Sequence, residues 1–512
     1  MNHTMTWHLN ALLDFGEDKH LIAREDRAYT MNRLLEICHM DAPEDERADR
    51  APECETATAI LNAICDHAVQ RGLFPDSAQR RDLFSAKLMG ALTPHPQMVR
   101  ERFYKLYSDL GPAAATQDFY RMCRNVDYIR VDRIAKNVRF FHDTRVGELE
   151  ITINLSKPEK DPRDIAAQKN AKQTGYPKCM LCVENPGYAG RMDFPARQNH
   201  RIVPVRLNGE SWYFQYSPYA YYDEHCIVFN RNHVPMRISR ESFVRLFDFV
   251  DQFPHYLLGS NADLPIVGGS ILSHDHFQGG GYTFPMERAG VRFRVESPDP
   301  AVEVCVADWP MTDIVLTGAD REAVIALTDR ILTAWRGYSD PECGIFAETD
   351  GAPHNTITPI ARRVGDAYRL HLVLRNNLTT EAHPLGVFHP HAELHHIKKE
   401  NIGLIEVMGL FSLPGRLKTE LAALADYLTG AQSIECAPDE VSPLAKHYTW
   451  VCDIAKRTGT KLSGEDAHTA LHDALADACA QVLIDSGVYK NTKSGNAGVL
   501  RFLRTIGCGD KI

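Results

Sequence analysis

The sequence of 512 residues lacks a long apolar stretch. No run of about 18 apolar residues occurs, and a helix needs about that length to cross a bilayer. The first residues, Met-Asn-His-Thr-Met-Thr-Trp-His, also lack the charged-then-apolar order of a secretory signal. Both absences favour a cytoplasmic protein without a membrane partner.

The sequence also lacks an excess of positive charge. Its 57 Lys and Arg residues are outnumbered by 67 Asp and Glu, which gives a formal net charge of −10. Nucleic-acid binders usually carry a basic patch or domain, so this class is disfavoured, whereas a nucleotide site needs only a few local cations. The 13 cysteines are scattered through a large chain rather than packed into a small framework, which indicates reduced thiols.

No internal repeat or low-complexity linker divides the chain, so its organisation is read from changes in apolar spacing. Residues 1–148 show helical spacing. Strand-like alternation begins at Leu149, and a hairpin is expected over 202–216, followed by a strand over 222–230 and a helix from Ser239. A second α/β region follows, with strands near 302–306 and 368–374 and a helix from Arg321. Helical spacing returns after Pro414, most clearly over 464–486, where Ser463 is the predicted cap.

Residues 261–281 contain the most unusual pattern in the chain. An apolar run leads to His274, His276 and Gln278, with glycine pairs or triplets on both sides. Residues two apart in a strand point to one face, so these three polar side chains would project together. Burying them without partners would be costly, and the glycines let backbone N–H groups approach a phosphate. The pattern predicts a catalytic site at a strand end rather than ordinary hydrogen-bonded histidines.

Cys179 and Cys182 form the only Cys-x-x-Cys pair in the sequence. Their spacing suits one tetrahedral metal ion, although redox motifs use it too. Because no second pair occurs, the remaining metal ligands must be histidines; the alternative is a pair of buried free thiols.

His-x-His-x-Gln resembles the active-site motif of the galactose-1-phosphate uridylyltransferases, a branch of the histidine-triad superfamily. The longer stretch Gly-Gly-Ser-Ile-Leu-Ser-His-Asp-His-Phe-Gln-Gly-Gly resembles the longer of that family's two branches. Asp275 stands where the better-known branch has proline between the histidines. The resemblance covers about residues 150–412.

The resemblance implies the fold and the metal sites. The fold is α+β, with two histidine-triad-like α/β halves with antiparallel sheets, at 149–288 and 289–412, between helical regions at 1–148 and 413–512. A structural zinc ion is implied, and so is a second metal site that includes a His-x-His pair and holds iron or zinc. The implied ligands of the zinc site are Cys179, Cys182, His233 and His274, and those of the second site are His389 and His391.

The resemblance also implies the substrate contacts. Uracil and ribose would be bound from the loop after the cysteine pair, and the sugar phosphate by a Lys placed four residues before a Gly. Two candidates come from the histidine stretch itself. The substrate-binding residues predicted in this way are Asn185, Arg191, Arg197, Asn199, Asn261, Ser270 and Lys399.

The implied reaction transfers uridylyl from UDP-glucose to galactose 1-phosphate through His276, with Gln278 donating to the α-phosphate and the carbonyl near His274 orienting the imidazole. A neutral imidazole is a competent nucleophile toward phosphorus. The alternative enzymes are a histidine-triad nucleotide hydrolase and a dinucleoside polyphosphate phosphorylase, which would use the same adduct. A metal-binding regulatory protein is the non-enzymatic alternative. Sugar preference and oligomeric state stay open.

Overall fold

The computed structural model describes residues 3–44, 53–156, 175–269 and 271–510. The chain divides into two compact units, the first made of Met1–Lys136 and Ser156–Val234 and the second of Asn137–Leu155 and Pro235–Ile512. Ser270, a predicted substrate ligand, lies outside the described residues.

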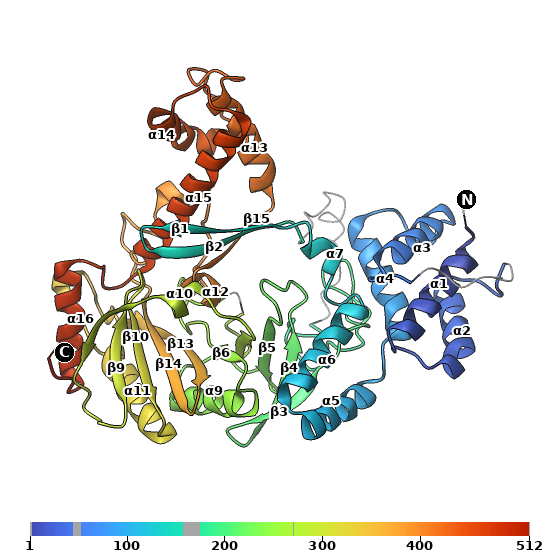
Figure 1. Cartoon of the computed structure of the whole chain (residues 1–512), viewed down its shortest axis with the longest axis horizontal. Coiled ribbons are helices and arrows are strands. Elements are labelled where there is room, and N and C mark those ends of the chain that lie inside the picture. Colours follow the sequence, from blue (N-terminus) through green and yellow to red (C-terminus); the bar gives the residue numbers. More distant parts are fainter. Residues whose placement is uncertain (1–2, 45–52, 157–174, 270, 511–512) are drawn as a thin grey trace. The chain divides into compact units, whose positions relative to one another are not determined.

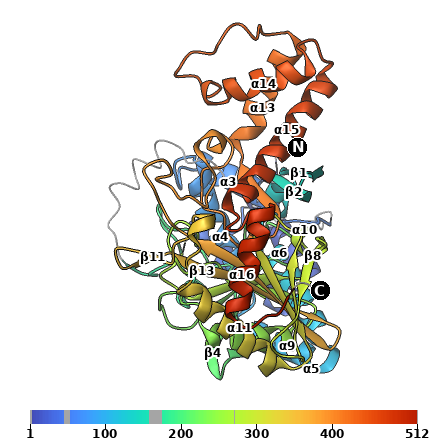
Figure 2. The same cartoon turned by 90° about the vertical axis from the view of Figure 1, so that its left-hand side faces the viewer.

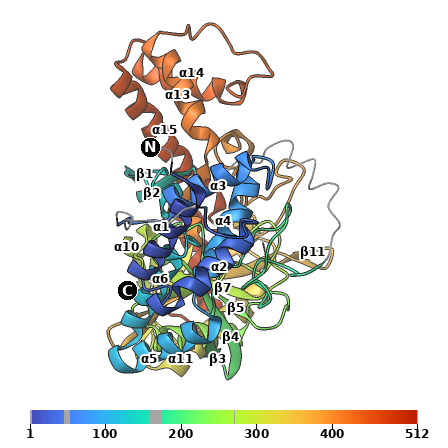
Figure 3. The same cartoon turned by 90° about the vertical axis from the view of Figure 1, so that its right-hand side faces the viewer.

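The first unit joins a helical region to three antiparallel strands (Figure 3). The predicted hairpin is confirmed, because β3 and β4 pair across Asn208 and Gly209, both with positive φ. The helices are α1 (Met5–Asp18), α2 (Arg27–Ile37), α3 (Thr58–Gln70), α4 (Ala78–Leu92), α5 (Pro96–Leu110), α6 (Pro112–Asn125) and α7 (Val131–Ile134), and the strands are β3 (Val203–Leu207), β4 (Glu210–Tyr216) and β5 (Cys226–Asn230).

Aromatic side chains attach the helices of the first unit to its sheet. Phe103 of α5 and Phe119 of α6 pack against Phe214 of β4, with ring centroids 6.3 and 5.8 Å away. All three side chains are buried, and aromatic rings contribute the largest buried area per residue to such a core. The stretch Arg100–Lys105 is therefore a helix with one buried aromatic edge.

The second unit contains a seven-strand antiparallel run in the order β7-β6-β13-β14-β10-β9-β8. Helices α9 (Arg240–Gln252) and α11 (Arg321–Arg336) pack against β13 and against each other (Figure 1). The strands are β6 (Leu257–Gly259), β7 (His276–Gly280), β8 (Val291–Val295), β9 (Glu303–Ala307), β10 (Asp313–Gly318), β13 (Asn355–Val364) and β14 (Ala367–Asn376).

Two smaller groups complete the second unit. The strands β1 (Val138–Thr144) and β2 (Gly147–Asn154) are antiparallel, and β15 (Leu410–Pro414) runs parallel to β2; β11 (Glu348–Thr349) pairs with β12 (Ala352–Pro353). Figure 2 shows the C-terminal helices, in which α13 and α14 pack with α15. The remaining helices are α10 (Pro285–Arg288), α12 (Leu404–Val407), α13 (Arg416–Thr429), α14 (Tyr448–Thr458), α15 (Gly464–Ser486) and α16 (Lys493–Thr505).

The predicted α+β architecture with antiparallel sheets is confirmed, and so is the helix over 464–486. Ser463 caps it, because its Oγ accepts from the backbone N–H of Asp466 at 3.1 Å. One helical expectation is wrong: β1 is a strand inside 1–148, and its exposed and half-buried residues alternate. Such a half-buried edge strand has only a weak apolar signal.

The predicted strand through the histidine stretch is shorter than expected. The described residues of 261–275, which are all but residue 270, contain no strand, and β7 begins only at His276. The segment instead folds back on itself: Ala262 bridges Gly268, Ile266 has a φ of 72°, and a Cβ on Gly268 would lie 2.6 Å from the carbonyl oxygens of Ala262 and Leu264. His274 therefore lies in a loop, so strand alternation does not place it beside His276.

Candidate active site and metal centre

His276 is held at the start of β7 by an unusually close strand pairing. A Cβ on Gly279 would lie 2.1 Å from the carbonyl oxygen of Leu257 on β6, so a residue with a side chain would force the two strands apart. His276 is 5% exposed and His274 is fully buried, while Gln278 is half-buried. The two histidines of the motif are thus buried, one on β7 and one in the loop before it, and Gln278 is partly accessible.

The imidazole of His276 has a defined tautomer. Its Nδ1 lies 2.8 Å from the carbonyl oxygen of His274. A carbonyl oxygen only accepts hydrogen bonds, so Nδ1 carries the proton and Nε2 keeps a free lone pair. The pKa of His276 is lowered to about 4, mainly by burial and also by the nearby His274 side chain, while the hydrogen bond to the carbonyl opposes this shift. The predicted carbonyl acceptor is confirmed.

Cys179, Cys182 and His233 converge within the first unit. The Sγ atoms of the two cysteines are 3.6 Å apart, and Cys182 Sγ lies 3.3 Å from His233 Nδ1. A disulfide would need about 2.05 Å between the sulfurs, whereas two thiolates at the Zn–S distance in a tetrahedron are about 3.8 Å apart. None of the 13 cysteines forms a disulfide, and the group that includes Cys179, Cys182 and His233 is compatible with a metal site.

The turn that carries the cysteines is held by Asn185. Its Nδ2 donates to the carbonyl oxygens of Cys179 at 2.9 Å and Cys182 at 2.8 Å, and the side chain is buried. The backbone N–H of Leu181 also points to Cys179 Sγ at 3.4 Å. The amide nitrogen of Asn185, a predicted substrate ligand, is therefore committed to shaping the cysteine turn.

The other predicted substrate ligands of the first unit lie in the same loop region. Arg191 donates to the carbonyl of Tyr176 at 3.0 Å and pairs with Asp193 at 2.6 Å. The guanidinium of Arg197 lies 5.5 Å from the ring centre of Tyr128. Asn199 is buried, and its Nδ2 donates to the carbonyl of Val126 at 2.8 Å. Their roles in substrate binding stay predictions.

Asn261 and the segment 398–406 form one network in the second unit. Asn261 Oδ1 accepts from the backbone N–H of Leu404 at 2.8 Å. Lys398 is buried and donates to Glu406 Oε1 at 2.9 Å, while Glu406 Oε2 accepts from the N–H of Gly403 at 3.2 Å. Lys399, the predicted phosphate ligand, is exposed. Lys398 thus anchors the segment through Glu406, while the next residue, Lys399, lies at the surface.

Two family models match most of the chain. The galactose-1-phosphate uridyl transferase N-terminal domain matches residues 20–235, and the C-terminal domain of the same family matches residues 249–450. The chain belongs to the galactose-1-phosphate uridyl transferase family. The match begins at residue 20, so it includes most of the N-terminal helices, beyond the range that carries the sequence resemblance.

Bacterial members of this family align with the chain almost from end to end. The galactose-1-phosphate uridylyltransferase of Bacillus subtilis (strain 168) is 49% identical over 504 residues, which are 98% of this chain and 97% of that protein. The enzyme of the same name from Caldanaerobacter subterraneus subsp. tengcongensis is 47% identical over 509 residues, 98% of each chain. The predicted function is confirmed: the chain is a nucleotidyltransferase of galactose metabolism with galactose-1-phosphate uridylyltransferase activity.

The second histidine cluster of this uridylyltransferase includes a residue that the sequence pattern does not predict. His391, Glu393 and Asp485 bring ligand atoms within 4.8 Å of one another. The backbone N–H of His391 donates to Asp485 Oδ2 at 3.3 Å, and His389 Nδ1 lies 3.2 Å from the carbonyl of Pro390. Asp485 lies on α15, 94 residues from His391, so no local motif connects the two. His389 stays a predicted ligand.

No helix in the described part of the chain combines the length and the apolar character needed to span a bilayer.

Proposed function

We propose that His276 carries the uridylyl group between two hexose 1-phosphates. Nε2 of His276 attacks the α-phosphorus of UDP-glucose, the bond from that phosphorus to the bridging oxygen breaks, and glucose 1-phosphate leaves with the electron pair. A phosphate oxygen of galactose 1-phosphate then attacks the same phosphorus. UDP-galactose forms, and the electron pair returns to Nε2.

The observation that carries this proposal is the hydrogen bond from His276 Nδ1 to the carbonyl of His274, at 2.8 Å. It leaves Nε2 as the nucleophilic nitrogen, and it stabilises the positive charge that the ring acquires when Nε2 bonds to phosphorus. Burial keeps the free imidazole neutral. Neither hexose phosphate needs a proton to leave or to attack, so the scheme requires no general acid.

Gln278 and Lys399 would stabilise the phosphates. Gln278 lies two residues after His276 on β7, so both side chains project to one face of that strand. Its amide would donate to a non-bridging oxygen of the α-phosphate, where negative charge accumulates in the transition state. Lys399, exposed at the end of the anchored segment, would balance the charge of the incoming hexose phosphate.

A structural metal would be held by Cys179, Cys182, His233 and His274, with zinc as the ion that suits two thiolates and two imidazoles. With four protein ligands it has no open position, so it would supply rigidity rather than chemistry. His274 would thereby hold both the metal and, through its carbonyl, the tautomer of His276. We also propose a second ion, iron or zinc, at His391 with His389 or with Glu393 and Asp485.

The two family domains would correspond to histidine-triad-like halves. We propose boundaries at 149–288 and 289–412, with an N-terminal region over 1–148 that is helical before β1 and a C-terminal helical region over 413–512 around them. In this arrangement the first half holds the nucleophile, and the second supplies Lys399 and the second histidine cluster.

Competition between acceptors tests the function. Enzyme and UDP-glucose are incubated with galactose 1-phosphate, inorganic phosphate or water alone, and the products are separated by anion-exchange chromatography. We expect UDP-galactose to form at least about a hundredfold faster than UMP or UDP, because galactose 1-phosphate is the acceptor that attacks the adduct. A hydrolase would resolve the same adduct with water. UMP as the main product in the presence of galactose 1-phosphate would instead identify a hydrolase, and UDP formed with inorganic phosphate would identify a phosphorylase.

Replacing Gln278 tests its role in the transition state. We expect Gln278→Ala to lower kcat by about 10- to 1,000-fold, as for the loss of one preorganised donor, while KM changes less. Gln252→Ala is the matched control, because Gln252 donates within its own helix to the carbonyl of Asp248. Steady-state kinetics with both sugars measure both variants. Unchanged kcat in Gln278→Ala would remove the amide from the transition state.

A further inference from the structure

A second cavity lies in the second unit, lined by none of the residues of the candidate active site. It has a volume of about 600 Å³, within the range that small-molecule sites occupy. Its walls come from the turn between β1 and β2, from α10, from the segment 308–310 and from the residues between α15 and α16. Segments far apart in the sequence thus enclose one space.

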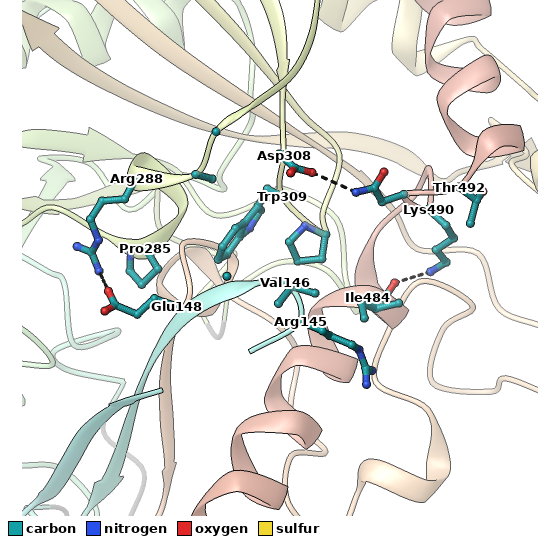
Figure 4. A pocket seen from close by; sticks show the side chains of 15 residues that line it. Arg145, Val146, Glu148, Pro285, Arg288, Asp308, Trp309, Ile484, Lys490 and Thr492 are labelled. Carbon is teal, nitrogen blue, oxygen red and sulfur yellow. Dashed lines mark hydrogen bonds and ion pairs between the residues drawn. The ribbon is translucent and has the colours of Figure 1, made fainter. Parts of the chain in front are cut away.

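The cavity has an apolar centre with charged groups at both ends (Figure 4). The rings of Pro285 and Trp309 lie at the centre (Figure 4), and Pro310 also lines the cavity. Figure 4 shows Arg288 and Glu148 on one side of these rings and Lys490 on the other. The guanidinium of Arg288 donates to the carboxylate of Glu148, so this first end is a neutral pair.

Two further cations, Arg145 and Lys490, line the cavity and make no hydrogen bond to a carboxylate within the described residues. Arg145 donates to the neutral side-chain oxygen of Gln481. Lys490 Nζ donates to the carbonyl oxygens of Ile484 at 2.7 Å and Asp485 at 2.8 Å, the last turn of α15. Both side chains therefore offer positive charge to the cavity, and an anion would be attracted to them.

Polar groups around the apolar centre match hydroxyl groups. The carboxylate of Asp308 accepts from Asn491 Nδ2 at 3.1 Å, and a carboxylate has room for further donors. Glu148 at the far end, together with Asn491 and Thr492, adds hydrogen-bonding atoms. Prolyl rings offer a flat apolar surface to the C–H face of a sugar. The carboxylates of Asp308 and Glu148 would repel a second anionic group, so a ligand would carry negative charge only at the end that meets Arg145 and Lys490.

We propose that this cavity binds a small phosphate monoester that carries hydroxyl groups, with its phosphate at Arg145 and Lys490 and its hydroxyls toward Asp308 and Glu148. Arg145 suits a phosphate because its planar guanidinium donates two parallel hydrogen bonds. Sugar phosphates and nucleoside monophosphates share this chemistry. The site is separate from the uridylyl-transfer site and is independent of the mechanism proposed for His276.

Isothermal titration of the full-length protein tests the site with three probes: glucitol 6-phosphate, UMP and inorganic phosphate. Glucitol 6-phosphate has no anomeric phosphate, so it is not a transfer substrate. We expect one ester to bind wild-type protein and to bind Arg145→Gln at least about tenfold more weakly, the loss expected for a charge-assisted hydrogen bond. The ester whose binding depends on Arg145 identifies the source as a sugar phosphate or a nucleotide.

One control variant and one further test variant accompany Arg145→Gln. Arg240→Gln removes an exposed arginine that pairs with Glu322, and it should bind like wild type. Lys490→Met should weaken the same ester; if it unfolds α15, Arg145→Gln still decides, because Arg145 is exposed on a turn. Transfer activity measured with UDP-glucose and galactose 1-phosphate as the only additions should be unchanged in Arg145→Gln, because Arg145 is not one of the residues of the candidate active site. The proposal would be overturned if neither ester bound Arg145→Gln more weakly than wild type, or if neither ester bound wild type at millimolar concentration. Inorganic phosphate binding as tightly as the esters would also overturn it, since the hydroxyls would then contribute nothing.

Discussion

UDP-glucose alone is expected to release glucose 1-phosphate in a burst no larger than the enzyme concentration. Without an acceptor the uridylyl group stays on His276, because the adduct is resolved by a second sugar phosphate. The labelled protein should be acid-labile and relatively stable in alkali, as phosphorus–nitrogen bonds are. With both sugars, double-reciprocal plots should be parallel, which is the mark of a ping-pong scheme. Rapid-quench kinetics and mass spectrometry of the adduct measure these outcomes.

Two histidine variants separate the nucleophile from its surroundings. His276→Ala should abolish both the burst and the adduct, because no other atom in the motif replaces Nε2. His391→Ala should weaken turnover but still form the adduct, since His391 faces Asp485 rather than the β7 motif. Intersecting lines with no release before acceptor is added would indicate direct transfer in a ternary complex. An adduct mass on any other residue would also end the assignment.

The second large effect concerns the metal. Purified protein is expected to contain about one tightly bound zinc per chain, and Cys179→Ser should lose it. Because the ion would connect ligands distant in sequence and a structural zinc site contributes folding energy outright, Tm should fall by about 5 °C or more. Elemental analysis and thermal unfolding in the presence and absence of a chelator measure both effects.

Cys452→Ser is the matched control for this variant. Cys452 is a free, half-buried cysteine on α14, and its replacement should change neither metal content nor Tm appreciably. If wild-type protein is purified without metal and its Tm equals that of Cys179→Ser, the two cysteines are instead a buried thiol pair. Loss of zinc from Cys179→Ser with His276 still labelled by UDP-glucose would agree with a structural role.

The local elements of the chain were predictable because nearest neighbours determine them. The hairpin across Asn208 and Gly209 and the helix 464–486 with its Ser463 cap depend on turn chemistry and spacing within a few residues. The same is true of the Cys179–Cys182 pair, whose sulfurs converge at 3.6 Å within one turn. The prediction of a strand leading to His274 was wrong for a related reason. The apolar run has the composition of a strand, but Gly268 packs closely against the backbone of Ala262 and Leu264.

By itself the sequence determined which residues can carry the chemistry: the nucleophile motif, the Cys-x-x-Cys pair and the family to which they belong. Only the tertiary structure decided which contacts the residues around these motifs make. Asn185 holds the cysteine turn, Lys398 rather than Lys399 is buried against Glu406, and Asp485 reaches His391 from 94 residues away. The cavity at Arg145 and Lys490 is likewise built from distant segments. Side-chain types and short spacings record chemical capacity, whereas contacts between distant segments arise only when the whole chain packs.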